Sequence, residues 1–239
     1  MPTSKASPIP CPDDIVCAYR RDPNNPLNRI YNGGWHPEGK RNFRKAVRTI
    51  TECLKTYKRA ALFHVCFERR TNDEHKALLH ALIRKLDRAG IPCEWFSARE
   101  IDGSKGEHLH AFILVDRQER QPQEFLNTFD DSFLGREAAK RGIKAYVNRP
   151  QNSIHGGQRF ASLPWLGSSR ETTELAIKRM EDAMIWLTYI FKARGKPVHA
   201  LLGQVFSASR PNRKRASNGV PVRGFAADTT ANQVVLEAA

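Results

Sequence analysis

The sequence predicts an α+β fold, and three observations support this prediction. Residues 42–58 and 71–90 carry apolar side chains at helical spacing, whereas residues 60–67 form a short apolar run that is typical of a buried strand. Residues 93–100 and 108–116 read as two strands, and the turn-forming stretch between them favours a hairpin. Helices therefore accompany at least one antiparallel pair of strands.

The two early helices are supported by different signals. The first, from about Asn42 to Lys58, is predicted by apolar residues at alternating gaps of four and three: Phe43, Val47, Ile50, Leu54 and Tyr57. The second opens on Thr71-Asn72-Asp73-Glu74, which matches a capping box, and is expected to stop at Gly90, just before Pro92.

The second half of the chain has weaker signals. A helix within Pro122–Arg141 is predicted, followed by a strand over Ile143–Asn148 and by a loop that contains Pro150 and Pro164. A long helix is then predicted over Glu171–Ala193, because Gly195 and Pro197 form a common helix end.

Three regions follow from these patterns. Residues 1–41 are rich in Pro, Asn and Gly and are expected to form an extended arm, residues 42–206 a single folded domain, and residues 207–239 a basic, disordered tail. We expect the tail to contact DNA through its cationic residues, Arg210, Arg213, Lys214 and Arg215.

The charge of the chain favours a polyanionic partner. Its 239 residues include 39 Lys and Arg against 25 Asp and Glu, which leaves a formal net charge of +14. Nucleic acid is therefore the first partner to consider. We expect a cytoplasmic protein with no membrane partner, because no apolar run approaches the ~18 residues of a spanning helix. The five cysteines lack the two-residue spacing of a zinc or redox motif.

The sharpest chemical signal is His108-Leu109-His110 on a predicted strand. Side chains two apart on a strand project from one face, so both imidazoles can bind one ion. If Glu100 lies opposite His108 across the hairpin, its carboxylate becomes a third ligand, and this set suits Mg²⁺ or Mn²⁺. Glu107 and Asp102 are the competing carboxylates, and an isolated His-x-His can also arise by chance.

A second signal is Tyr189 on the predicted long helix. It lies roughly opposite the apolar stripe of that helix, with Lys192 adjacent, so it is either an ordinary surface residue or a nucleophile presented to a cleft. A nearby cation and a Lewis acid would activate the phenol for attack on a phosphodiester, and we expect Lys192 to supply the first and the predicted metal site the second.

These residues resemble a known family. Glu94 to Glu100, a Gly-containing turn, His108-Leu109-His110 and, later, Tyr189-Ile190-Phe191-Lys192 look like the inovirus gene-two-type, or YagK/YfjJ-like, replication proteins of the HUH endonuclease superfamily. The resemblance spans about residues 60–196. It implies a central antiparallel sheet flanked by helices, with a ferredoxin-like or RRM-like palm, and a single nucleophilic tyrosine.

The resemblance also implies an activity. Such proteins use a divalent metal to nick and rejoin single-stranded or supercoiled origin DNA through a 5′-phosphotyrosine intermediate, which initiates rolling-circle replication. Glu100, His108 and His110 match the metal ligands, Tyr189 the nucleophile and Lys192 the lysine that follows it. A phage or plasmid initiator would rely on a host helicase and polymerase. The alternatives are a relaxase or transposase with the same chemistry, a non-catalytic DNA-binding regulator on this fold, and a metal-dependent hydrolase of a small molecule.

Overall fold

An antiparallel β-sheet forms the centre of the computed structural model, which describes residues 34–102, 106–117, 133–150, 158–166, 174–192, 196 and 205–209. Within these ranges the strands are β1 (Ala60–Glu68), β2 (Cys93–Asp102), β3 (Gly106–Asp116), β4 (Lys144–Asn148), β5 (Ala161–Ser162) and β6 (Phe206–Ala208). The helices are α3 (Gly39–Leu54), α4 (Asn72–Arg88), α6 (Phe133–Lys140) and α7 (Glu174–Leu187), and α7 continues into the short 3₁₀ helix η2 (Thr188–Phe191).

The order of the strands confirms the predicted α+β class. Neighbours in the sheet run β4-β1-β3-β2-β6, with β5 paired to β1, and every pair is antiparallel. The series β1-α4-β2-β3-α6-β4 is therefore a βαββαβ unit of the ferredoxin-like type. The predicted hairpin is β2 and β3, which pair along their whole length.

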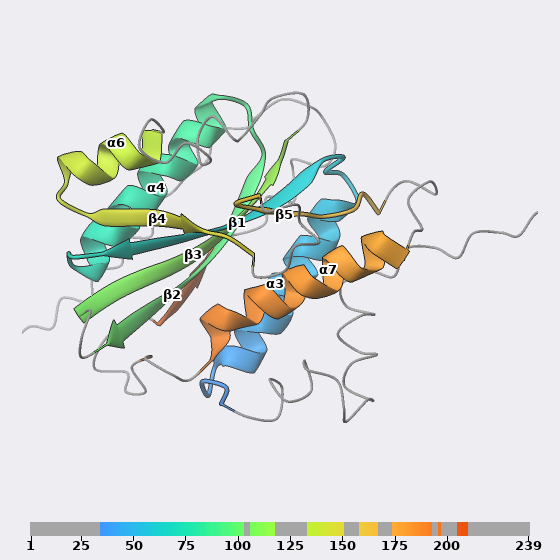
Figure 1. Ribbon diagram of the computed structural model, residues 1–239, viewed down its shortest axis with the longest axis horizontal. Helices are drawn as coiled ribbons and strands as arrows, with labels where there is room; N and C mark the ends of the chain where they lie inside the picture. The colour runs from blue at the N-terminus through green and yellow to red at the C-terminus, as the bar shows by residue number, and fades with distance from the viewer. Residues whose placement is uncertain are drawn as a thin grey trace, which may run out of the picture.

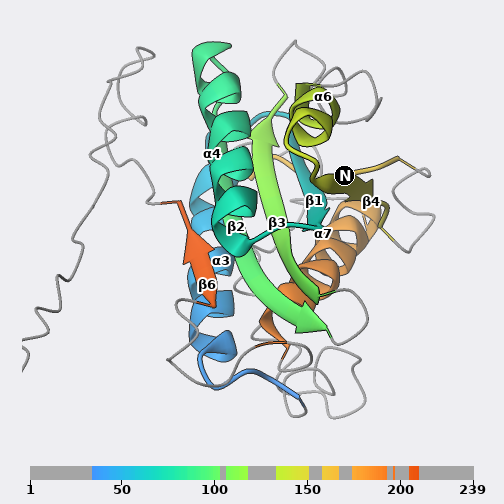
Figure 2. The same cartoon turned by 90° about the vertical axis from the view of Figure 1, so that its left-hand side faces the viewer.

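Helices cover both faces of the sheet. Helices α4 and α6 lie on one face, and α3 and α7 lie on the other (Figures 1 and 2). Each face has its own apolar core, because alternate residues of a strand point to opposite sides. On β1, for example, Phe63 and Val65 pack toward α4, while Leu62 packs toward α3 and α7.

Helix α4 has the ends that its sequence predicts. The Thr71 hydroxyl accepts the Glu74 backbone N–H, and the Glu74 carboxylate accepts the Thr71 N–H, which completes the capping box. At the other end Gly90 takes a positive φ of 71°, and Ile91 N–H bonds back to the Leu86 carbonyl.

Two other helices differ from their predicted bounds. Helix α3 begins at Gly39 and ends at Leu54, earlier at both ends than the apolar pattern indicates. The predicted long helix ends as an α-helix at Leu187, and Lys192 has an extended backbone that forms an isolated β-bridge with Trp35. This contact is distant in sequence, so no local signal announces it.

The remaining predictions fared unevenly. The weak helix within 122–141 is α6, and the predicted strand over 143–148 is β4. Strands β5 and β6 were not predicted, because two or three residues are too few to show a period.

The predicted arm and the tail beyond Ser209 lie outside the described residues, apart from residues 34–41. Among the described helices, none is long and apolar enough to cross a membrane.

Candidate metal centre

The β2–β3 hairpin brings three predicted ligands together. Glu100 lies directly opposite His108 in the register, and His110 follows on the same face of β3. All three side chains are buried on the α3/α7 side, where Phe112 and Leu114 of the same strand already belong to the apolar core. The competing Glu107 alternates to the other face and forms an ion pair with Arg99. The side chain of Asp102 is outside the described part of the structure.

The three ligand atoms converge on one point. Oε2 of Glu100 lies 3.1 Å from Nε2 of His108 and 3.3 Å from Nε2 of His110. An ion with ligands at about 2.1 Å separates neighbouring ligand atoms by about 3.0 Å at right angles and about 3.4 Å in a tetrahedron. The two carboxylate-to-imidazole distances therefore suit a single divalent cation, and all three ligand atoms lie within 4.8 Å of one another.

The surroundings of His108 suit either a proton or a metal ion at Nε2. Its Nδ1 lies 3.2 Å from the Gly106 carbonyl, which can only accept, so Nδ1 carries a proton. Nε2 faces the Glu100 carboxylate at 3.1 Å, and this contact raises the pKa of His108, so a second ring proton fills the place between them when no metal ion does. A carbonyl acceptor on the outer nitrogen is the usual support of a metal-binding histidine.

Lys196 contacts the other carboxylate oxygen of Glu100. Its Nζ makes an ion pair with Oε1, and both side chains are almost fully buried. Burial alone would raise the pKa of Glu100, but the two histidines and the Lys196 ammonium outweigh it and hold the pKa well below its ordinary value. Glu100 is therefore an anion in the folded protein, with Oε2 directed to the histidines.

A second donor set shares His110. His64 and Cys66 project from β1 beside it, because Cys66 pairs with His110 in the β1–β3 register. Nδ1 of His110 lies 2.9 Å from the Cys66 sulfur and 3.0 Å from Nε2 of His64. The amide of Asn148, on β4, lies 2.9 Å from the same sulfur.

The two sets use different nitrogens of the His110 ring. Nδ1 faces Cys66 and His64, whereas Nε2 faces Glu100, is buried and has no hydrogen-bond partner among the described residues. Burial lowers the pKa of His64 and raises that of Cys66, so both are neutral and suited to orient the ring. Nε2 of His110 contacts the Glu100 carboxylate at 3.3 Å without a hydrogen bond among the described residues, which favours the Glu100, His108 and His110 set as the ion's ligands.

Tyr189 lies against this centre although it is far away in sequence. Its ring centroid is 5.0 Å from that of His110 and 5.6 Å from that of His64. The side chain is 43% exposed, so one part of the phenol contacts the histidines and another meets solvent. The structure thus brings Tyr189, His108, His110 and Glu100 to one place.

Lys192 has a different setting from the predicted one. It follows η2 in extended backbone, half-buried, and does not continue the helix of Tyr189. Lys196, which sequence reasoning missed, is the lysine that contacts the candidate ligands. The tail residues that we expect to contact DNA lie outside the described residues: Arg210, Arg213, Lys214 and Arg215.

The competing tyrosines are placed less suitably. Tyr146 on β4 donates its hydroxyl to Glu68 at 2.8 Å, and burial together with the neighbouring Cys66 and Glu68 raises its pKa. Tyr57 belongs to the apolar core. Tyr19 and Tyr31 are not among the described residues.

His64 and Cys66 were missed for a clear reason. His64-Val65-Cys66 has the same alternation as His108-Leu109-His110, but only the register between β1 and β3 shows that both pairs share a face.

Comparisons with protein-family models, with curated proteins and with solved structures found no match to this chain. The assignment of a function therefore depends on the site itself.

Proposed function

We propose that the chain is a metal-dependent DNA nicking and joining enzyme of the HUH type, with Tyr189 as its nucleophile. The observation that carries the proposal is the contact between the Tyr189 ring and His110, which joins the candidate nucleophile to the candidate ligands. Their spacing in sequence cannot produce this contact; the packing of α7 and η2 on the sheet does. The net charge of +14 suits a nucleic-acid substrate.

The residues divide the chemistry as follows. Glu100, His108 and His110 would hold a Mg²⁺ or Mn²⁺ ion, which when bound polarises the scissile phosphate as a Lewis acid. Tyr189 loses its proton to the solvent that reaches its exposed ring, and its oxygen forms a bond to phosphorus. The bond from phosphorus to the 3′ oxygen breaks, and that oxygen takes up a proton from water to give a free 3′ hydroxyl.

The reverse attack rejoins the strand. The 3′ hydroxyl displaces Tyr189 from the 5′ phosphate, and the phenol recovers its proton. We assign the stabilisation of the phenolate to Lys192, three residues after Tyr189, and Lys196 would hold the Glu100 carboxylate with Oε2 toward the ion. In the cell this reaction would start rolling-circle replication of a phage or plasmid, with a host helicase and polymerase extending the 3′ end; a relaxase or transposase would use the same steps.

The test is an adduct assay with the full chain. Single-stranded plasmid or phage origin DNA is incubated with the protein and Mn²⁺, and a covalent product is sought on denaturing gels. Tyr189→Phe should form no adduct while binding DNA and metal normally, because the phenyl ring keeps its packing and loses only the attacking oxygen. Tyr146→Phe is the matched control and should keep full activity.

Mass spectrometry of the digested adduct then identifies the modified residue. A nucleotide on Tyr146 or any other tyrosine would contradict the assignment. Lys192→Ala should slow adduct formation by about tenfold to a hundredfold without abolishing it, as expected for loss of one positioned cation.

One observation favours a second function, a non-catalytic DNA-binding regulator. The Lys196 ammonium already neutralises Glu100, so the carboxylate has a counterion without any metal. In that case the protein would retard origin DNA without cleaving it, and Mn²⁺ would not raise its unfolding temperature. The adduct assay and a thermal unfolding series with Mn²⁺ separate the two functions.

A further inference from the structure

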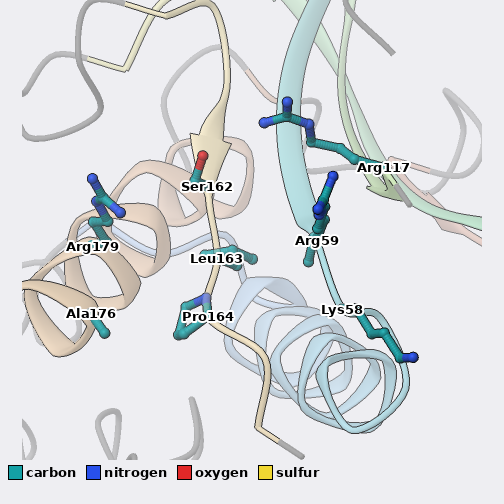
Figure 3. A pocket seen from close by; sticks show the side chains of 9 residues that line it. Lys58, Arg59, Arg117, Ser162, Leu163, Pro164, Ala176 and Arg179 are labelled. Carbon is teal, nitrogen blue, oxygen red and sulfur yellow. The ribbon is translucent and has the colours of Figure 1, made fainter. Parts of the chain in front are cut away.

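A basic pocket lies at the end of β1 away from His64 and Cys66. Its volume is about 340 Å³, within the range of small-molecule sites. Figure 3 shows Arg59 and Arg117 on one side of it and Arg179, from α7, on the other, with Ser162 of β5 between them. Lys58 completes the set of cations at its wall.

The pocket concentrates positive charge. Among the described residues that line it there are three arginines and one lysine and no acidic side chain. Asp116, the sequence neighbour of Arg117, directs its carboxylate to the Arg59 backbone N–H at 3.3 Å and is not part of the wall. Like charges gathered in this way favour an anionic ligand.

Packing against Phe160 fixes the side chain of Arg117 at the pocket wall. Its guanidinium lies 4.9 Å from the centre of the Phe160 ring, which fixes the side chain by a cation–π contact. Its Nε is buried and has no hydrogen-bond partner among the described residues. Burial, and to a smaller extent the nearby Arg59 charge, lowers the pKa of Arg117.

The chemistry of the wall selects phosphate. A planar guanidinium donates two parallel hydrogen bonds to a phosphate, and a serine hydroxyl adds a neutral donor. Leu163 and Pro164 supply an apolar part beside these donors, as a sugar or base would require. A phosphate that belongs to a nucleotide unit therefore suits the pocket better than a bare inorganic anion.

The pocket is linked to the candidate metal centre by two rigid elements. Ala60 lines the pocket and Cys66 lies beside His110, so β1 spans about 20 Å between the two at about 3.3 Å per residue. Ala176 lines the pocket and Tyr189 contacts His110, and α7 with η2 gives a similar span of about 20 Å at about 1.5 Å per residue. An extended single strand bridges this distance with a few nucleotides.

We propose that this pocket binds a backbone phosphate of the DNA strand a few nucleotides from the phosphodiester that lies at Tyr189. The proposal rests on the proposed nicking function, which requires a DNA strand to lie at Tyr189. It assigns to Arg117 and Arg179 the anchoring of the substrate, a role separate from the bond-making at the metal centre. The same phosphate chemistry could come from a free nucleotide, and the test separates these two sources.

The first arm of the test measures binding of a labelled single-stranded oligonucleotide to the full chain over a range of salt. The double variant Arg117→Gln/Arg179→Gln should bind about tenfold more weakly, and the slope of log affinity against log salt should become shallower by about 0.7 for each phosphate that the variant no longer binds. Arg84→Gln removes a charge from α4 on the opposite face of the sheet and should change neither quantity.

The conservative variant Arg117→Lys guards against a folding artefact. It keeps the charge and the packing over Phe160 but removes the bidentate donor, so it should keep the salt slope of the wild type and bind with lower affinity. If the double variant binds no more weakly than Arg84→Gln, the pocket is not a DNA site and the proposal is wrong.

The second arm uses AMP and inorganic phosphate as competitors. Neither competitor should displace the oligonucleotide at concentrations near that of the DNA, because the contact with one phosphate supplies only a small part of the oligonucleotide's binding free energy. Displacement at such concentrations would assign the pocket to a free nucleotide instead. The adduct assay is scored separately. Absence of the salt effect with adduct formation intact overturns only the pocket, whereas an intact salt effect with no adduct overturns only the nicking function.

Discussion

Two groups of charged side chains, at opposite ends of β1, differ in charge and in burial. At one end Glu100, His108 and His110 are buried, contact one another and present lone pairs to a shared point. At the other, Arg117 and Arg179 line an open pocket without an acidic neighbour in its described wall. In the proposed function the first arrangement would bind a small cation and polarise a bond, and the second would bind a polyanion through many weak contacts. Chemistry and affinity should therefore be separable by mutation.

The largest effect should follow from removal of a histidine ligand. We expect His108→Ala or His110→Ala to lower nicking by at least about a thousandfold, because Lewis-acid stabilisation is worth several kcal/mol and each 1.4 kcal/mol is a factor of ten. DNA affinity should change little, and Glu100→Ala should be nearly as damaging. Cleavage and filter binding are measured side by side, with His80→Ala on α4 as the control. Equal cleavage by wild type and His110→Ala would remove the metal hypothesis.

The next effect concerns the buried ion pair between Lys196 and Glu100. Lys196→Met leaves the buried carboxylate without its ammonium, so the metal-free protein should lose about 3–5 kcal/mol of unfolding free energy in urea titrations with a chelator. Added Mn²⁺ should stabilise this variant more than the wild type, since the ion then replaces the missing cation at Glu100.

The control for this comparison is Lys144→Met. Lys144 pairs with Glu68 at 2.8 Å from a half-exposed position, so its removal should cost less than about 1 kcal/mol. If Mn²⁺ stabilises Lys196→Met and the wild type equally, Glu100 is not a ligand of the ion.

A smaller effect is expected at Cys66. Because the sulfur faces Nδ1 of His110, we assign it to orienting the ring, and Cys66→Ser should lower nicking by no more than about threefold. Cobalt substitution gives the decisive readout. The wild-type Co²⁺ protein should lack a near-ultraviolet sulfur-to-cobalt charge-transfer band. Such a band, absent from Cys66→Ser and kept in Glu100→Gln, would place the ion between His64, Cys66 and His110 instead.

The smallest effect should come from the basic tail. Removing the residues after Arg210 leaves β6 and the Ser209 N–H bond to Trp95 in place. The salt slope of DNA binding should fall while the cleavage site stays the same, since tail charges would contact phosphates and carry no base readout. An unchanged slope would show that the tail does not engage DNA.

Local patterns were sufficient for part of the centre. The alternation of His108 and His110 and a short turn place Glu100 opposite them, and all of this information lies within one hairpin. The contact of Tyr189 with His110 was expected only through the family resemblance. The positions of His64 and Cys66 beside His110 depend on the pairing of β1 with β3. The two strands are separated in sequence by α4 and β2, and neither strand's own sequence predicts that they pair.

Lys196 and the end of α7 were hidden for a related reason. The helical pattern of α7 continues past Leu187, yet Thr188 bonds its hydroxyl to the Ile185 carbonyl at 2.6 Å and Lys192 pairs with Trp35. Contacts with a distant segment decide where the helix stops. They also decide which lysine reaches Glu100, and the spacing after Tyr189 pointed to Lys192 instead.

The start of α3 has a practical consequence for designing a shortened form of the protein. The His36 N–H bonds to the Phe191 carbonyl at 3.3 Å, and a Cβ on Gly39 would meet the same oxygen at 2.2 Å. The segment that carries Tyr189 is thus fastened by residues that precede the apolar pattern of the first helix. A shortened protein that began at Asn42 would keep all three candidate metal ligands and lose the contacts that hold the proposed nucleophile. The smallest active version should begin before Trp35 and end after Ser209.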